Sequence, residues 1–254
     1  MDHRPIGIFD SGMGGLTVWR EVRRALPGES IVYLGDGARC PYGSRPAAEI
    51  CRFSEEAVER LSDCKLIVVA CNTATAAAID HLRATYPIPF VGMEPAIKPA
   101  CLATRSRVVG VLATERSLEG DLFRRTAARY GADIEVLTTP GRGLVELVEA
   151  DKEQSDEALT VCRTLLQPML ERGADRIVLG CTHYPFLIDT LRRAAAGYEV
   201  EFVDPSPAVA RRVVQLLDEN ELHAEPTHQP CYDFITFADA AYAERLRRKA
   251  LGNK

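Results

Sequence analysis

The stretch KLIVVAC, which runs from Lys65 to Cys71, has a near copy, DRIVLGC, from Asp175 to Cys181. Each is a short apolar run that ends in a cysteine, and small polar residues follow both cysteines. Runs of this kind, rich in valine and isoleucine, are typical of strands that are buried on both faces of a parallel sheet. The two copies therefore predict a duplicated α/β unit with one cysteine in each half.

The similarity continues on both sides of the cysteines. Three further pairs of segments match in the same order: IGIFDS (6–11) with VGVLAT (109–114), IDHLR (79–83) with IDTLR (188–192), and PFVGMEP (89–95) with EFVDP (201–205). If the two halves face each other, their thiols approach one ligand from opposite sides. That arrangement is suited to removing a proton from one face of a carbon and returning one to the other face.

Apolar runs alternate with amphipathic stretches along the whole chain, which is the pattern of parallel strands joined by crossover helices. Strands are expected to begin near Ile6, Ile31, Leu66, Phe90, Val108, Ile134, Ile177 and Glu201. The predicted fold class is α/β, with two pseudo-symmetric domains and mainly parallel sheets. We expect a first domain over 1–95, a second over 96–206, and a segment over 207–254 that packs back on the first. Polar residues at the carboxyl ends of the strands mark the expected ligand site.

Composition excludes several classes of function. The 254 residues carry a formal charge of -5, and no basic run is longer than Arg247 to Lys249, so a nucleic-acid partner is not expected. No apolar run approaches the roughly 20 residues that a membrane-spanning helix needs. A signal-peptide core is also absent from the first residues, and we therefore expect a cytoplasmic protein whose eight cysteines remain thiols.

Two of those eight cysteines differ from the rest. Cys71 and Cys181 each lie at the end of a strand that is predicted to be buried, and each precedes a predicted helix. Amide groups and the helix dipole favour a thiolate at such a position. A free cysteine is more often a small buried apolar residue. We assign that structural role to Cys51, Cys64, Cys101, Cys162 and Cys231, and we expect Cys40 to be a bystander.

Ionisable neighbours are expected beside both thiols. Asp10 and Ser11 follow the strand that begins at Ile6, which suits a carboxylate beside Cys71, although Asp10 is also a candidate helix cap. His183 lies two residues after Cys181 and is a candidate proton donor or acceptor. A lone histidine is often structural, and both readings remain open.

The same residues also fit other functions in part. The loop DSGMGG, with Asp36 further along, resembles a dinucleotide fingerprint, but Thr17 occupies the third glycine position. The glycines are better explained by a tight turn and close backbone approach to an anion. No metal site is expected, because no C-x-x-C pair occurs. A cysteine hydrolase or amidotransferase needs only one thiol, and a non-catalytic amino-acid binder needs none.

In combination, five ordered motifs resemble the glutamate racemases of the cofactor-independent aspartate/glutamate racemase superfamily. They are IGIFDSGMGGLTV from Ile6, YLGDGARCPYGSR from Tyr33, CNTAT from Cys71, EPAIKPA from Glu94 and GCTHYP from Gly180. The resemblance implies an active site between two related α/β domains, glutamate as the substrate, and no pyridoxal phosphate or metal. It also implies D-glutamate supply for peptidoglycan, and a homodimer is expected because dimers are common in the family.

The same resemblance implies roles for individual residues. Cys71 would deprotonate D-glutamate with Asp10 in support, and Cys181 would deprotonate L-glutamate with His183 in support. The family's substrate contacts fall on Ser11, Pro41, Tyr42, Gly43, Asn72, Thr73, Thr114 and Thr182. Glu149 matches the auxiliary acid, but Glu146 lies one helical turn earlier and is an alternative. Ser117 replaces the usual second threonine of the second domain.

Overall fold

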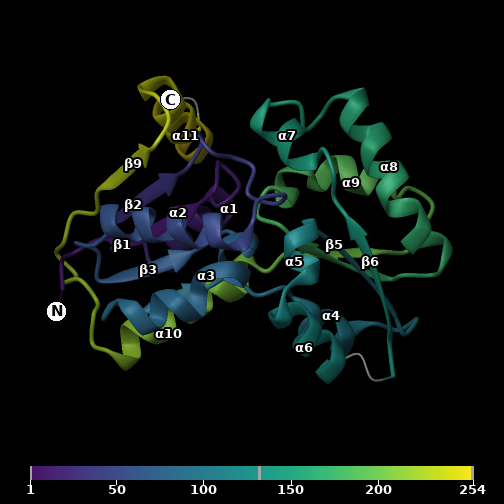
Figure 1. The fold of residues 1–254 in the computed structure, drawn as a ribbon, viewed down its shortest axis with the longest axis horizontal. Helices are drawn as coiled ribbons and strands as arrows, with labels where there is room; N and C mark the ends of the chain where they lie inside the picture. The colour runs from purple at the N-terminus through teal and green to yellow at the C-terminus, as the bar shows by residue number, and fades with distance from the viewer. Residues whose placement is uncertain (1, 131–132, 253–254) are drawn as a thin grey trace. The chain divides into compact units, whose positions relative to one another are not determined.

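The computed structural model describes residues 2–130 and 133–252. The chain forms two compact units, one built from Met1–Met93 together with Ser206–Lys254 and the other from Glu94–Pro205. Each unit contains one sheet (Figure 1). Within the described residues, every helix is too short or too polar to cross a bilayer.

Strands and helices alternate in both units. Unit 1 contains β1 (Ile6–Asp10), α1 (Leu16–Ala25), β2 (Ile31–Gly35), α2 (Ala47–Arg60), β3 (Leu66–Val69), α3 (Asn72–Thr85), β4 (Phe90–Gly92), α10 (Ser206–Glu219), β9 (Tyr232–Thr236) and α11 (Ala240–Leu251). Unit 2 contains α4 (Ile97–Ala103), β5 (Val108–Ala113), α5 (Glu115–Glu119), α6 (Asp121–Tyr130), β6 (Glu135–Pro140), α7 (Leu144–Glu149), α8 (Asp156–Glu171), β7 (Arg176–Gly180), the 3₁₀ helix η1 (Tyr184–Leu187), α9 (Ile188–Ala194) and β8 (Glu201–Val203).

The two sheets repeat one topology. The first has the strand order β4-β3-β1-β2-β9, and the second has β6-β5-β7-β8. Read from its other end, the second order is β8-β7-β5-β6, which matches β4-β3-β1-β2 strand for strand. All strand pairs in the described residues are parallel, so the predicted α/β class is confirmed. The segments KLIVVAC and DRIVLGC form the equivalent strands β3 and β7.

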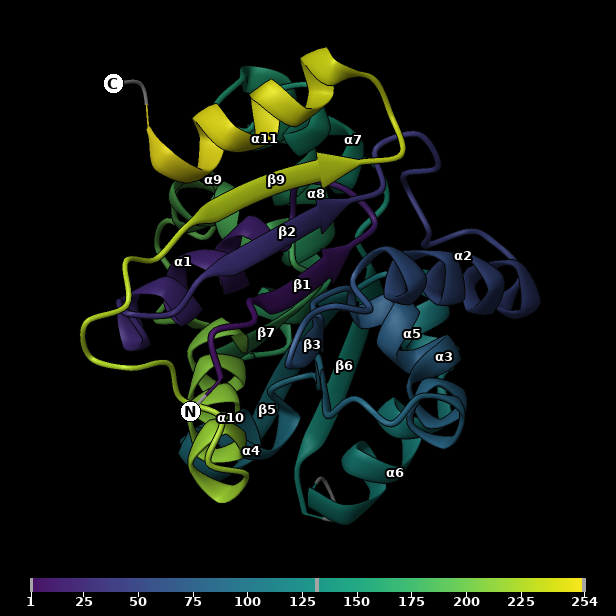
Figure 2. The same cartoon turned by 90° about the vertical axis from the view of Figure 1, so that its left-hand side faces the viewer.

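Helices cover both faces of the first sheet. Phe9 and Ile67 point into an apolar cluster with residues of α2 and α3, so these two helices lie on one face. Side chains alternate across a strand, and Tyr33 therefore points the other way from Leu34, which is in that cluster. On the Tyr33 face, Trp19 of α1 packs edge-on against Tyr232 with ring centroids 5.5 Å apart. Figure 2 shows β9 beside β2, with α11 along it.

The second sheet is covered in the same way. Val109 and Val111 of β5 pack with Ile97 of α4 and Phe123 of α6 in one apolar cluster. Gly110, between the two valines, faces the opposite side, where a β-carbon would lie only 2.7 Å from the sulfur of Met169 in α8. Glycine at this position lets α8 pack directly against the strand.

Candidate functional site

The polar residues that end the strands of unit 1 lie along one edge of its sheet. Asp10 pairs in register with Gly35, so Asp36 follows at the same edge, and its backbone N–H donates to the Asp10 carbonyl oxygen at 2.9 Å. On the other side of β1, Phe9 pairs with Val69, which brings the end of β3 and then Cys71 beside Asp10. Unit 1 therefore presents two carboxylates and a thiol at the carboxyl edge.

The glycine-rich loop after β1 wraps around the Asp10 carboxylate. Oδ2 of Asp10 accepts the backbone N–H groups of Gly12 at 3.1 Å and Gly15 at 3.0 Å. A β-carbon on Gly15 would lie 2.7 Å from that of Asp10, so the approach requires glycine. The anion for which a glycine turn was predicted is thus held within the chain itself. Asp10 is not the cap of α1, because Gly15 occupies that position.

Cys71 occupies the N-cap of α3. Its sulfur accepts the backbone N–H of Ala74 at 3.4 Å, and its thiol lies 3.6 Å from the Ser11 hydroxyl oxygen. The side chain is 5% exposed. The predicted position of Cys71 at the start of a helix is confirmed, and the partial positive charge of a helix N-terminus favours a negative charge on a sulfur placed there.

Asn72, the first residue of α3, stands next to the thiol. Its side chain is 4% exposed, and neither its amide nitrogen nor its amide oxygen has a hydrogen-bond partner among the described residues. A buried amide without partners costs about 1–3 kcal/mol per unsatisfied group, which is a feature of sites that await a ligand. Thr73 is also buried, while Pro41, Tyr42 and Gly43 lie in the loop between β2 and α2.

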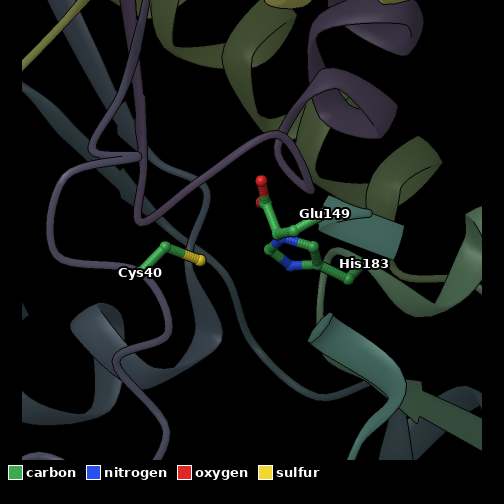
Figure 3. Close-up of side chains that lie close together, drawn as sticks. All are labelled: Cys40, Glu149 and His183. Atoms are coloured by element: carbon green, nitrogen blue, oxygen red, sulfur yellow. The ribbon is translucent and has the colours of Figure 1, made fainter. Parts of the chain in front are cut away.

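In unit 2, Cys181 follows β7 at the carboxyl edge of the second sheet. Its sulfur lies 3.8 Å from Nδ1 of His183. Nε2 of the same ring is 2.7 Å from Oε1 of Glu149 at the end of α7, and Figure 3 shows these two side chains close together. His183 is 1% exposed. The three side chains form a relay from sulfur to imidazole to carboxylate, in which the carboxylate orients the ring and selects its tautomer.

This relay separates the two candidate acids of α7. Glu149 is half-buried and paired with His183, whereas Glu146 is exposed to solvent. Glu146 and Glu149 lie one helical turn apart on nearly the same face, but their neighbours differ. Only Glu149, at the end of α7, reaches the imidazole of His183. The geometry thus supports Glu149 as the partner.

In unit 2, threonines lie at the carboxyl ends of β5 and β7. Ala113 pairs with Gly180, so Thr114 lies beside Cys181 at the edge of the sheet. Thr114 caps α5, and its hydroxyl oxygen lies 2.8 Å from that of Ser117, which has replaced the expected threonine. Thr182 is 2% exposed and directly precedes the histidine.

The helix predicted after Cys181 is present, but it begins as the 3₁₀ helix η1 at Tyr184, whose N–H donates to the Cys181 carbonyl oxygen, and not as an α-helix like the one that follows Cys71. One sequence prediction about cysteines is wrong. Cys231 is exposed and not buried. Its backbone belongs to the start of the β2–β9 pairing, where the Ile31 N–H donates to its carbonyl, and its side chain points outward.

The sequence patterns did not indicate one cluster, which is formed by Asp36 and its partners. Asp36, considered only as part of a dinucleotide fingerprint, is fully buried and accepts hydrogen bonds from Arg39 and Tyr42. An aspartate directly after a buried strand was the available signal, since buried carboxylates need partners.

Comparison with known proteins identifies relatives over the whole chain. Residues 7–213 match the family model described as Asp/Glu/hydantoin racemase. A glutamate racemase from Herpetosiphon aurantiacus is 45% identical over 250 residues, which cover 98% of both chains. The crystal structure of glutamate racemase from Francisella tularensis in complex with D-glutamate superposes with a TM-score of 0.84 at 29% identity, covering 100% of this chain and 96% of that one. The Escherichia coli glutamate racemase, solved with L-glutamate and the activator UDP-MurNAc-ala, has a TM-score of 0.82 at 33% identity, with 96% and 92% covered.

Proposed function

Because the chain belongs to the Asp/Glu/hydantoin racemase family, and within it to the glutamate racemases, we propose that it interconverts L- and D-glutamate by two-base proton transfer through Cys71 and Cys181. The main observation in support of this proposal is that the two thiols occupy equivalent positions, each directly after the corresponding strand of a repeated sheet topology. Acyl transfer has no use for a second thiol at that position, whereas inversion of a stereocentre does.

The chemistry needs one thiolate and one thiol at the start of each turnover. In the D-to-L direction, the Cys71 thiolate takes the α-hydrogen as a proton, and the electron pair left on the α-carbon delocalises into the α-carboxylate. The Cys181 thiol then donates its proton to the opposite face of that carbon. The reverse direction exchanges the two roles, and after each turnover the protonation states of the thiols are reversed.

The neighbours of each thiol fit these roles by different means. The Cys71 sulfur accepts an amide N–H at the start of α3, which supports the negative form without a cation. At Cys181 the supporting group is the imidazole of His183, which Glu149 orients at 2.7 Å. The imidazole is suited to take a proton from the thiol or return it, with the carboxylate stabilising the charged ring.

Glutamate binding is assigned to neutral groups. The proposed contacts are the hydroxyls of Ser11, Thr73, Thr114 and Thr182, the amide of Asn72, and the loop residues Pro41, Tyr42 and Gly43. Hydroxyl, amide and backbone N–H donors can hold the two carboxylates of glutamate. The unpartnered Asn72 amide supports this assignment, since a bound carboxylate would satisfy its buried donor.

The wider role proposed is supply of D-glutamate for peptidoglycan, by a homodimer in the cytoplasm. The mechanism needs Cys71 and Cys181 as free thiols, a state that a reducing compartment maintains, and all eight cysteines are free in the structure. The peptidoglycan role rests on membership of the glutamate racemases.

In deuterium oxide without added cofactor, L-glutamate is expected to give D-glutamate that carries one α-deuterium. The donating thiol exchanges its proton with solvent before the substrate binds, and a cysteine carries only that one proton. Early in the reaction the remaining L-glutamate should stay unlabelled. Chiral chromatography with mass spectrometry, sampled at initial rates, measures both pools. Product without deuterium contradicts the mechanism, and hydrolysis of glutamine without any inversion would favour an amidotransferase instead.

Replacing Glu149 with glutamine is expected to lower kcat by about 10-fold or more in both directions, because a hydrogen bond to a charged group contributes about 1.5–3 kcal/mol. The amide can still reach Nε2 of His183 but cannot stabilise an imidazolium. Glu146→Gln is the matched control: the same substitution in the same helix, at an exposed residue. Steady-state kinetics by circular dichroism compare the two. Equal effects of both substitutions would remove Glu149 from the relay.

A further inference from the structure

Tyr42, in the loop between β2 and α2, is anchored at its hydroxyl. The side chain is 1% exposed, and its ring packs against those of Phe53 and Phe9, with centroids 5.6 Å and 6.3 Å away. The phenol donates a hydrogen bond of 2.5 Å to Oδ2 of Asp36. One loop residue is therefore fixed both by packing and by a charged acceptor.

Asp36, which accepts the hydrogen bond of the Tyr42 hydroxyl, directly follows β2. Its Oδ2 also accepts Nε of Arg39 at 2.6 Å, while Oδ1 is buried and has no partner among the described residues. Burial raises the pKa of the Asp36 carboxyl, and the hydrogen bond from Tyr42 and the charge of Arg39 oppose that rise. Burial also raises the pKa of the Tyr42 phenol well above its ordinary value, with the Asp36 charge adding to the effect. The phenol thus remains protonated and acts as a donor.

Arg39, which binds Asp36, also contacts α2 and the segment after β9. Its guanidinium carbon lies 4.0 Å from the ring centroid of Phe53 in α2 and 4.5 Å from that of Phe237, which follows β9. Nη1 donates to Glu56 of α2. Arginine is suited to this place, since its flat cation can stack on aromatic rings while its edge pairs with carboxylates.

We propose that Asp36 and Arg39 are positioning residues for glutamate binding, which act through the Tyr42 hydroxyl on the backbone of Tyr42 and Gly43. The inference rests on the proposed function, in which these loop residues contact the substrate. Asp36 and Arg39 transfer no proton; their role is to fix the loop whose backbone N–H groups are the proposed contacts of glutamate. An effect of this kind acts on substrate and transition state alike, so it changes KM and leaves kcat nearly constant.

Tyr42→Phe tests the anchor, because it removes one oxygen atom and keeps the aromatic packing. The KM for both enantiomers is expected to rise about 10-fold or more, the size typical of a lost hydrogen bond to a charged group, with kcat within about 3-fold. Tyr86→Phe is the matched control in the same unit: Tyr86 is half-buried, and no hydrogen bond of its hydroxyl is described. Its KM should equal that of the wild type.

Variants of Asp36 separate positioning from simple stability. Asp36→Asn retains an oxygen that can accept from Tyr42 and should recover most of the affinity, whereas Asp36→Ala should raise KM as Tyr42→Phe does. The double variant Asp36→Ala/Tyr42→Phe should then be no worse than either single one, since both remove the same bond. Additive increases in KM, or a loss of stability with KM unchanged, would overturn the inference.

Hydrogen exchange of the amides over 40–46 tests the anchor without relying on activity. Tyr42→Phe should speed exchange in this loop relative to Tyr86→Phe, while strands β1 and β3 stay protected. Unchanged exchange would overturn the inference whatever the kinetics. A wild type that does not racemise glutamate would instead refute the proposed function, and the exchange rates would still report the anchor.

Discussion

Replacing Cys71 with alanine is expected to abolish inversion in both directions and to leave one half-reaction. In the proposed mechanism, Cys181 still removes the α-hydrogen of L-glutamate, but no thiol remains to protonate the opposite face. The rate of racemisation should fall by at least about 10²–10⁴-fold, the usual contribution of one acid–base group. Slow exchange of the α-hydrogen with deuterated solvent should persist for L-glutamate and be lost for D-glutamate.

Cys181→Ala should give the mirror result, with exchange retained only for D-glutamate. Proton NMR of each enantiomer, incubated separately with each variant, measures the exchange directly. Cys51→Ala in unit 1 and Cys101→Ala in unit 2 are controls of the same chemistry and should keep wild-type activity. If both active-site variants lost exchange of the same enantiomer, the assignment of one thiol to each face would be wrong.

Replacing Lys65 with methionine is expected to destabilise unit 1 by about 3–5 kcal/mol, the usual cost of leaving one member of a buried ion pair without its partner. Lys65 is 2% and Glu29 is 4% exposed, and Nζ lies 2.6 Å from Oε2 of Glu29. The ammonium also donates to the Asp2 carbonyl at 2.7 Å, while Oε1 of Glu29 accepts the Ala224 N–H at 2.8 Å. The pair and its backbone partners thus join four segments that are distant in sequence.

Urea unfolding followed by fluorescence measures this loss, because the single tryptophan, Trp19, is in α1 of unit 1. Lys152→Met is the control, since its ion pair with Glu157 is exposed and contributes at most about 1 kcal/mol. The double variant Lys65→Met/Glu29→Gln should be more stable than Lys65→Met alone, because no unpaired charge remains. A Lys65→Met midpoint equal to that of Lys152→Met would contradict the expectation.

Much of the fold could be predicted because each strand corresponds to a local run of mainly apolar residues. The strands expected at Ile6, Ile31 and Leu66 begin at those residues as β1, β2 and β3. The strand expected near Ile134 begins one residue later, at Glu135, and the strand expected near Ile177 begins one residue earlier, at Arg176, which pairs with Val109. The pairing of β9 with β2 could not be predicted, since partners so distant in sequence leave no local pattern.

The site residues also fall into those that the local sequence predicts and those that it does not. The positions of Cys71 and Cys181 follow from the repeat, and the pairing of His183 with its sulfur follows from two residues of spacing. The choice between Glu149 and Glu146 required the path of α7, and the Asp36–Arg39–Tyr42 cluster required the fold of a loop without periodicity. Side-chain networks of this kind depend on where loops end, which neither propensity nor spacing encodes.

The first unit is interrupted in sequence, because α10, β9 and α11 complete it after Glu94–Pro205 have formed the second. On a ribosome, the inserted unit is therefore fully emerged while β2 still lacks its outer neighbour. The nascent protein would carry an open sheet edge until Tyr232–Thr236 are released and add to it. Unit 2 can thus complete its fold before unit 1 does.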